Sequence, residues 1–225
     1  MAEAAIHKTM QRGGGRVGGG WFGPRRALRA ATLDRAEQAL VLVLWTALVG
    51  RVLVSPNGHA WLVLISEAMV LVMVLARRPT QSISRHSGDW IVALVATAAP
   101  LLIAPGPDLF PRLDPLGMAL VASGNVLQFA AKLALRRSFG LAPAHRGLKT
   151  GGPYGLVRHP MYAGYLLVHI GILLLMPSWL NGAIYAIGWT AQLRRLAAEE
   201  ALLGEDRAYR AYCANVRWRL VPFVY

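Results

Sequence analysis

Charge and cysteine are both scarce in this chain, and each shortage excludes a class of protein. Only 16% of the residues are charged and 55% are hydrophobic, whereas a soluble domain carries roughly a quarter charged residues. The mean hydropathy is +0.41, so the composition excludes an ordinary soluble domain and indicates an integral membrane protein. Cys213 is the single cysteine, which excludes an internal disulfide framework.

Acidic residues are also few, since 11 Asp and Glu stand against 24 Lys and Arg and leave a net charge of +13. Such an excess can indicate a nucleic-acid partner. Here the basic residues form no single patch, and they lie between long apolar stretches. We therefore predict no nucleic-acid partner and attribute the charge to membrane topology, with attraction to anionic headgroups as a secondary effect.

Six apolar stretches predict an all-α, polytopic membrane bundle of six helices. Several are near the short end of the roughly 17–25 residues that a spanning helix needs. The sixth is interrupted by Asn181, Gly182 and Gly188, and its short connection to the fifth predicts an antiparallel hairpin. The stretches lie near 37–55, 60–76, 89–104, 115–135, 161–178 and 182–198.

The basic residues also predict the orientation of this bundle. If the N-terminus is cytoplasmic, segments 1–35, 77–88, 136–160 and 194–225 hold 21 of the 24 Lys and Arg, and the outer loops hold only Arg112. Because Lys and Arg collect in cytoplasmic loops, we expect both termini and the 136–160 loop on the cytoplasmic face. The Ala-, Arg- and Gly-rich composition is typical of a high-GC bacterium, so we expect a bacterial inner membrane.

Three regions follow from this map. We predict a flexible basic arm over 1–32, a four-helix membrane region over 33–135 and a catalytic region over 136–225. The first thirty residues contain no apolar core of a signal peptide, so none is predicted.

Polar residues within the first four stretches need partners. Arg51 and Glu67 fall at similar depth, which predicts an ion pair holding the first two helices together. Asn125, Gln128 and Lys132 share one face of the fourth helix. That face is equally compatible with a cavity lining and with hydrogen bonds between helices.

The densest group of chemically useful residues lies in a turn-rich loop before the fifth stretch. Gly151, Gly152 and Pro153 form a turn that lets backbone groups approach a ligand closely. Pro160 favours a helix start near Met161, whose N-terminal N–H groups suit a carboxylate. His159 and Tyr162 add hydrogen-bonding groups, although His159 alone is equally compatible with a structural role.

The end of the sixth stretch carries two opposite charges on one face. Arg195 and Glu199 are four residues apart, so they are neighbours along a helix. One interpretation is an internal salt bridge. The other is a divided site, in which Arg195 on the membrane side holds an anionic group from lipid and Glu199 on the cytoplasmic side holds a cationic amine from water.

Three sequence patterns resemble the isoprenylcysteine carboxyl methyltransferase family. They are Gly152-Pro-Tyr-x-x-x-Arg-His-Pro-x-Tyr-x-Gly164, then Glu199-Glu200-x-x-Leu203, then Gly204-Glu-Asp-x-x-Tyr209-x-x-Tyr212. The resemblance covers about residues 136–225. Phospholipid N-methyltransferases share much of the pattern, and membrane sterol reductases share it more loosely.

The resemblance implies S-adenosylmethionine as the methyl donor, no metal, and a lipid-like or prenylated acceptor bound from the membrane. It assigns the acceptor carboxylate to Arg195, as the catalytic orienting residue. The related N-methyltransferases add Glu200 to the acids that contact the cofactor. The implied cofactor-binding residues are Arg146, Gly147, Leu148, Lys149, Tyr154, His159, Pro160, Met161, Tyr162, Glu199 and Glu200.

The expected reaction is carboxyl O-methylation of an isoprenylcysteine-like or other amphipathic lipid acid. A carboxylate acceptor is already ionised at neutral pH and needs no general base. The alternatives are a phospholipid or amine N-methyltransferase, whose acceptor must lose a proton, and a membrane reductase that uses NADPH.

Overall fold

All regular structure in the described part of the chain is helical. The computed structural model describes residues 24–76, 87–135 and 150–225. The predicted arm therefore lies largely outside the described residues, as do Arg146, Gly147, Leu148 and Lys149. The elements are α2 (Pro24–Leu53), α3 (Ala60–Ala76), α4 (Ser87–Ala98), η1 (Ala99–Leu102), η2 (Pro111–Leu113), α5 (Asp114–Leu135), η4 (Gly152–Gly155), α6 (Pro160–Leu175), α7 (Trp179–Leu203) and α8 (Arg207–Asn215).

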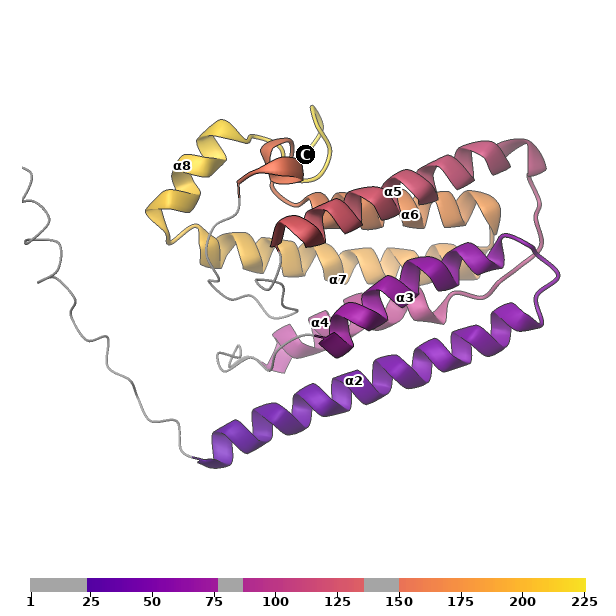
Figure 1. Ribbon diagram of the computed structural model, residues 1–225, viewed down its shortest axis with the longest axis horizontal. Coiled ribbons are helices and arrows are strands. Elements are labelled where there is room, and N and C mark those ends of the chain that lie inside the picture. The colour runs from indigo at the N-terminus through magenta and orange to yellow at the C-terminus, as the bar shows by residue number, and fades with distance from the viewer. Residues whose placement is uncertain (1–23, 77–86, 136–149) are drawn as a thin grey trace, which may run out of the picture.

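Each of the six longer helices overlaps one of the six predicted apolar stretches, although α2 begins earlier and α4 ends earlier than predicted, and Figure 1 shows the helices running side by side. Two of them contain segments that are long and apolar enough to cross a membrane, Arg35–Leu53 and Pro111–Ala134. Three shorter apolar helices cover Ala60–Ala76, Ile91–Leu102 and Pro160–Leu175. Helices α2 and α3 pack together, α4 packs on α7, and α5 packs along α6.

The α5–α6 contact is the closest in the bundle because glycines face each other across it. A Cβ added at Gly124 would lie 2.7 Å from the Gly164 carbonyl oxygen, and one added at Gly171 would lie 2.6 Å from the Gly117 carbonyl oxygen. Small residues allow such backbone approach between membrane helices. The seven-residue spacing on both helices keeps the two pairs in register and fixes the start of α6.

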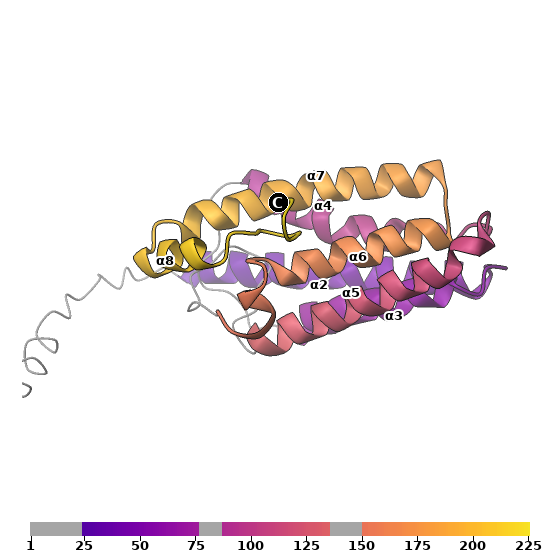
Figure 2. The same ribbon diagram turned by 90° about the horizontal axis from the view of Figure 1, so that it is seen from above.

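Helix ends are set by local sequence. Proline occupies the first position of α6, directly after His159, because its fixed φ suits the start of a helix. The Ser178 hydroxyl accepts from the Leu180 N–H at 3.2 Å and starts α7, so α6 and α7 form the predicted hairpin (Figure 2). Asp206 caps α8 in the same way, accepting from the Ala208 N–H at 2.8 Å.

The predicted ion pair between Arg51 and Glu67 is wrong. The Arg51 guanidinium donates instead to the carbonyl oxygens of Leu101 and Leu102, which η1 leaves free at that depth. The cation close enough to act on Glu67 is Lys132 of α5. Lys132 itself donates to the Gln128 side-chain oxygen at 3.2 Å.

On the same face of α5, the Asn125 amide donates to the Ser66 hydroxyl of α3 at 2.9 Å. Of the two interpretations of this polar face, hydrogen bonding between helices therefore holds for Asn125.

Candidate active site

Glu200, near the end of α7, is surrounded by positive charge. Its carboxylate lies 3.0 Å from Arg158 Nη1, 3.1 Å from His159 Nε2 and 2.7 Å from Arg219 Nε. The Tyr209 hydroxyl donates to it at 3.4 Å. Burial opposes its ionisation, but the His159 hydrogen bond and the neighbouring cations outweigh burial and hold the pKa of the Glu200 carboxyl below its usual range.

These contacts tie three distant segments together: the loop before α6, the end of α7 and the C-terminal tail. The N–H groups of Arg158 and His159 donate to the carbonyl oxygens of Trp218 and Arg219 at 2.8 and 2.9 Å. The Tyr212 hydroxyl of α8 donates to the Tyr154 carbonyl at 2.6 Å. Hydrogen bonds and ion pairs from α7, α8 and the C-terminal tail therefore hold this loop in place.

Gly152 supplies the backbone freedom that this loop requires. Its φ is +62°, in the left-handed region that favours glycine. The turn leads into η4 and places Tyr154 in a buried position beside α8. Burial and the nearby Glu199 carboxylate raise the pKa of the Tyr154 phenol, so it remains a hydrogen-bond donor at neutral pH.

Glu199 has a different environment from Glu200. Its carboxylate accepts one hydrogen bond, from the Tyr162 hydroxyl at 3.2 Å. Among the described residues no cation lies within ion-pair distance of it, and the side chain is only partly buried. Of the two acids that were predicted to contact the cofactor, Glu199 is the one whose charge the described residues leave unpaired.

Arg195, one helical turn before Glu199, also lies beside Tyr162. Its guanidinium carbon is 5.9 Å from the centroid of the Tyr162 ring, within range of a cation–π contact. The described residues show no direct ion pair between Arg195 and Glu199, so the salt-bridge interpretation is not supported. Glu199 does act on Arg195 electrostatically, and Glu37 of α2 does so more weakly.

A cavity of about 30 Å³ lies between α3, α4, α6 and α7. Its volume is room for one or two water molecules. Three of the predicted site residues line it: Met161, Tyr162 and Arg195. The remaining lining comes from Glu67, Val70, Met73, Val74, Ala96, Thr97, Pro100, Tyr165, His169 and Gln192.

The structure thus divides the predicted residues into two neighbouring groups. Tyr162, Glu199 and Arg195 form one group, with Tyr154 beside it. His159 and Glu200 form the other, and Pro160 is the buried first residue of α6 between them. The predicted contacts at 146–149 lie outside the described residues.

Sequence reasoning missed two sets of residues. The partners of Glu200 on the tail, Arg219 and Tyr209, follow no periodic pattern that would indicate their contact. The cavity residues had a signal: Gln192 lies three residues before Arg195, and His169 lies seven after Tyr162. These spacings place each on the same helix face as a predicted site residue.

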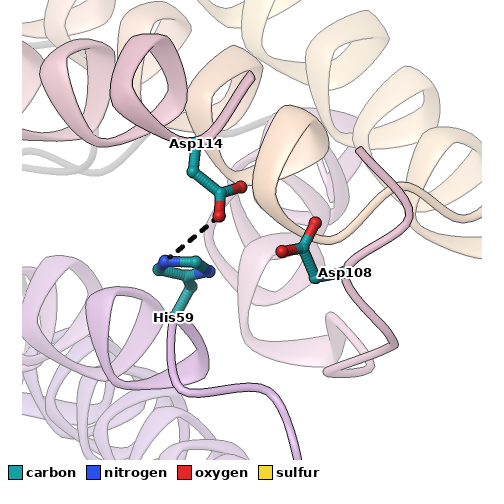
Figure 3. Close-up of side chains that lie close together, drawn as sticks. All are labelled: His59, Asp108 and Asp114. Carbon is teal, nitrogen blue, oxygen red and sulfur yellow. Dashed lines mark ion pairs between the residues drawn. The ribbon is translucent and has the colours of Figure 1, made fainter. Parts of the chain in front are cut away.

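A separate polar cluster lies at the opposite end of the bundle. His59, Asp108 and Asp114 offer metal-ligating atoms within 4.8 Å of one another (Figure 3), and His59 Nε2 is 3.7 Å from Asp114 Oδ2. All three are partly exposed, and Asp108 already accepts from the Phe110 N–H at 3.2 Å. This cluster is far from Glu199, and we assign no catalytic part to it.

Comparison with known proteins relates the matched region to membrane methyltransferases. A model of the phospholipid methyltransferase family matches residues 114–209. Protein-S-isoprenylcysteine O-methyltransferase A of Arabidopsis thaliana is 26% identical over 142 residues, covering 60% of this chain and 72% of the relative. Form B from the same plant is 26% identical over 151 residues, covering 63% and 76%. A Delta(14)-sterol reductase of Mus musculus is 33% identical over 89 residues, covering 36% and 20%.

The matched segment runs from α5 into α8 and contains every described residue that the sequence predicted for the site. With two curated methyltransferases matching over most of their length, the chain is a methyltransferase. It is related to the isoprenylcysteine carboxyl methyltransferase family, and helices α2 to α4 lie outside the segment matched by the family model.

Proposed function

We propose that this protein is an S-adenosylmethionine-dependent membrane methyltransferase that esterifies the carboxylate of an amphipathic, isoprenylcysteine-like lipid acid. The observation that carries the proposal is the division at Tyr162. Arg195 lies by the Tyr162 ring and lines a cavity between helices, whereas the Tyr162 hydroxyl donates to Glu199, a carboxylate without an ion-pair partner among the described residues.

The residues around Glu199 fit the amino group of this cofactor. A partly exposed carboxylate with one neutral hydrogen-bond donor retains acceptor positions for an ammonium. The protonated Tyr154 phenol beside it can donate to a second polar group. Glu200 has its positions filled by Arg158, His159 and Arg219, so we assign it to bracing the loop.

The cofactor supplies an electrophilic methyl group on a sulfonium, and the protein supplies alignment and a dry environment. An ionised carboxylate is the nucleophile and needs no general base. Arg195 can orient it through two parallel N–H donors. Tyr162 contacts both Arg195 and Glu199, so we assign it to aligning the two ends of the site.

The surface of the bundle suits six spans with the site facing the cytoplasm. Large apolar side chains are exposed on several helices, where lipid would cover them. Among them are Val43, Trp61, Ile65, Val72, Val126, Phe129 and Leu133. Together with the distribution of Lys and Arg, this supports cytoplasmic termini.

A labelling experiment tests the orientation. A cysteine introduced at Trp179, which is 85% exposed at the start of α7, should react with a membrane-impermeant maleimide from outside the cell. Reaction only after lysis would reverse the predicted orientation of α6 and α7.

Protection and turnover together test the activity. S-adenosylhomocysteine should raise the thermal midpoint of the purified protein, NADPH should not, and labelled methyl should pass to a prenylated thioether acid. A second candidate, an amine N-methyltransferase, is favoured by the buried Glu67 carboxyl in the cavity, which could accept a proton. Methylation of phosphatidylethanolamine but of no acid would establish it.

A further inference from the structure

The cavity contains two buried hydrogen-bond acceptors that the described residues leave without a donor. Glu67 of α3 is 4% exposed and Gln192 of α7 is 6% exposed. Among the described residues the Gln192 side-chain oxygen has no hydrogen-bond partner, and Lys132 acts on the Glu67 carboxylate electrostatically without a described ion pair between them. Both side chains line the same cavity as Arg195.

Unpaired polar groups at this depth are costly, because burial removes their hydrogen bonds to water. Lys132 acts on Glu67 electrostatically, but its described contacts are the Gln128 side-chain oxygen at 3.2 Å and the Tyr165 ring at 5.5 Å, so it gives Glu67 no described hydrogen bond. Two acceptors that face one cavity are satisfied by a guest that brings a donor. One or two water molecules can do this, and so can a ligand N–H.

His169 adds the complementary group. Its Nδ1 accepts from the Trp189 indole N–H at 3.0 Å, so a neutral ring carries its hydrogen on Nε2. Stacking on Tyr185 at 4.3 Å holds the ring in place. The cavity therefore offers acceptors and one donor that together match an amide, whose N–H and C=O are adjacent.

We propose that Glu67 and Gln192 select acceptors that carry an amide N–H beside the carboxylate held by Arg195. The proposal rests on the function proposed above and adds the specificity of its lipid side. Glu67 comes from α3, outside the segment matched by the family model, and Gln192 comes from α7, inside it. Met73 and Met161 also line the cavity, and such flexible thioethers can move to admit a head larger than water.

A pair of acids that differ in the amide tests the proposal. N-acetyl-S-farnesylcysteine has an amide beside its carboxylate, and S-farnesyl-3-mercaptopropionate has the same thioether and carboxylate without it. The wild type should favour the first by about tenfold to a hundredfold in kcat/KM, as expected for a hydrogen bond to a charged group. The matched variants are Glu67→Gln, Gln192→Met and the control Met73→Leu, which keeps the polar lining.

The two polar variants should lower this preference at least about threefold. The control should keep the preference, and all three variants should bind S-adenosylhomocysteine like the wild type. Where Glu67→Gln fails to fold, the Gln192→Met variant carries the test. Equal turnover of both acids, or an unchanged ratio in a folded Gln192→Met, would show that the cavity holds water only. If the wild type methylates neither acid, the proposal is also overturned. If it additionally fails to bind S-adenosylhomocysteine, the proposed function has failed as well.

Discussion

Adjacent glutamates at the end of α7 should respond in opposite ways to the same substitution. In Glu199→Gln the loss is a charge-assisted hydrogen bond to the cofactor amine, a cost of about 1.5–3 kcal/mol, so affinity for S-adenosylhomocysteine should fall about tenfold to a hundredfold. Its folding stability should change little, because its one described partner is the neutral Tyr162 hydroxyl.

In Glu200→Gln the loss is structural. The carboxylate is 10% exposed and contacts Arg158, His159 and Arg219. Breaking a fully buried pair costs about 3–5 kcal/mol, but Arg219 is 39% exposed and screened by solvent, so we expect about 2 kcal/mol. The thermal midpoint should fall while the folded fraction retains cofactor affinity.

Titration calorimetry and thermal unfolding of both variants in the same detergent measure the two effects. The reasoning is refuted if Glu200→Gln loses cofactor binding at unchanged stability while Glu199→Gln binds normally. The two acids would then exchange their assignments.

Two further predictions concern stability. The folded-state pKa of Glu200 is depressed, so its contribution to folding stability is present above the unfolded pKa of about 4.3 and is lost as the pH falls through the lower folded value. The difference in thermal midpoint between wild type and Glu200→Gln should therefore shrink below about pH 4. Gly124→Ala places a Cβ 2.7 Å from the Gly164 carbonyl oxygen and should cost about 1–3 kcal/mol, whereas Gly50→Ala meets nothing within 4 Å and should not destabilise the protein. Equal midpoints for the two alanine variants would contradict the close α5–α6 packing.

Part of this site was predictable because helix geometry is local. The four-residue spacing of Arg195 and Glu199 placed them on one side of α7, and the His-Pro step placed the start of α6 correctly. The difference between Glu199 and Glu200 was not predictable. It depends on Arg219, which the fold of the C-terminal tail brings into contact with Glu200.

The membrane region shows the same limit. Similar depth predicted that Arg51 would meet Glu67, but depth does not determine which helices are neighbours around the bundle. The glycine pairs bring α5 against α6, and the hydrogen bond from Asn125 to Ser66 joins α5 to α3, where Lys132 acts on Glu67. Arg51 instead donates to carbonyl oxygens of η1. Partner choice between helices depends on packing that sequence spacing alone does not contain.

The division of the site at Tyr162 is tested most directly by Arg195→Lys. Lysine keeps the charge but loses the two-pronged geometry that aligns a carboxylate. Transfer of labelled methyl to N-acetyl-S-farnesylcysteine should fall at least about tenfold. The affinity for S-adenosylhomocysteine should stay within about twofold, because Glu199 contacts the Tyr162 hydroxyl and has no described ion pair with Arg195. A parallel collapse of cofactor binding would contradict the division and make Arg195 a structural partner of Tyr162 and Glu37.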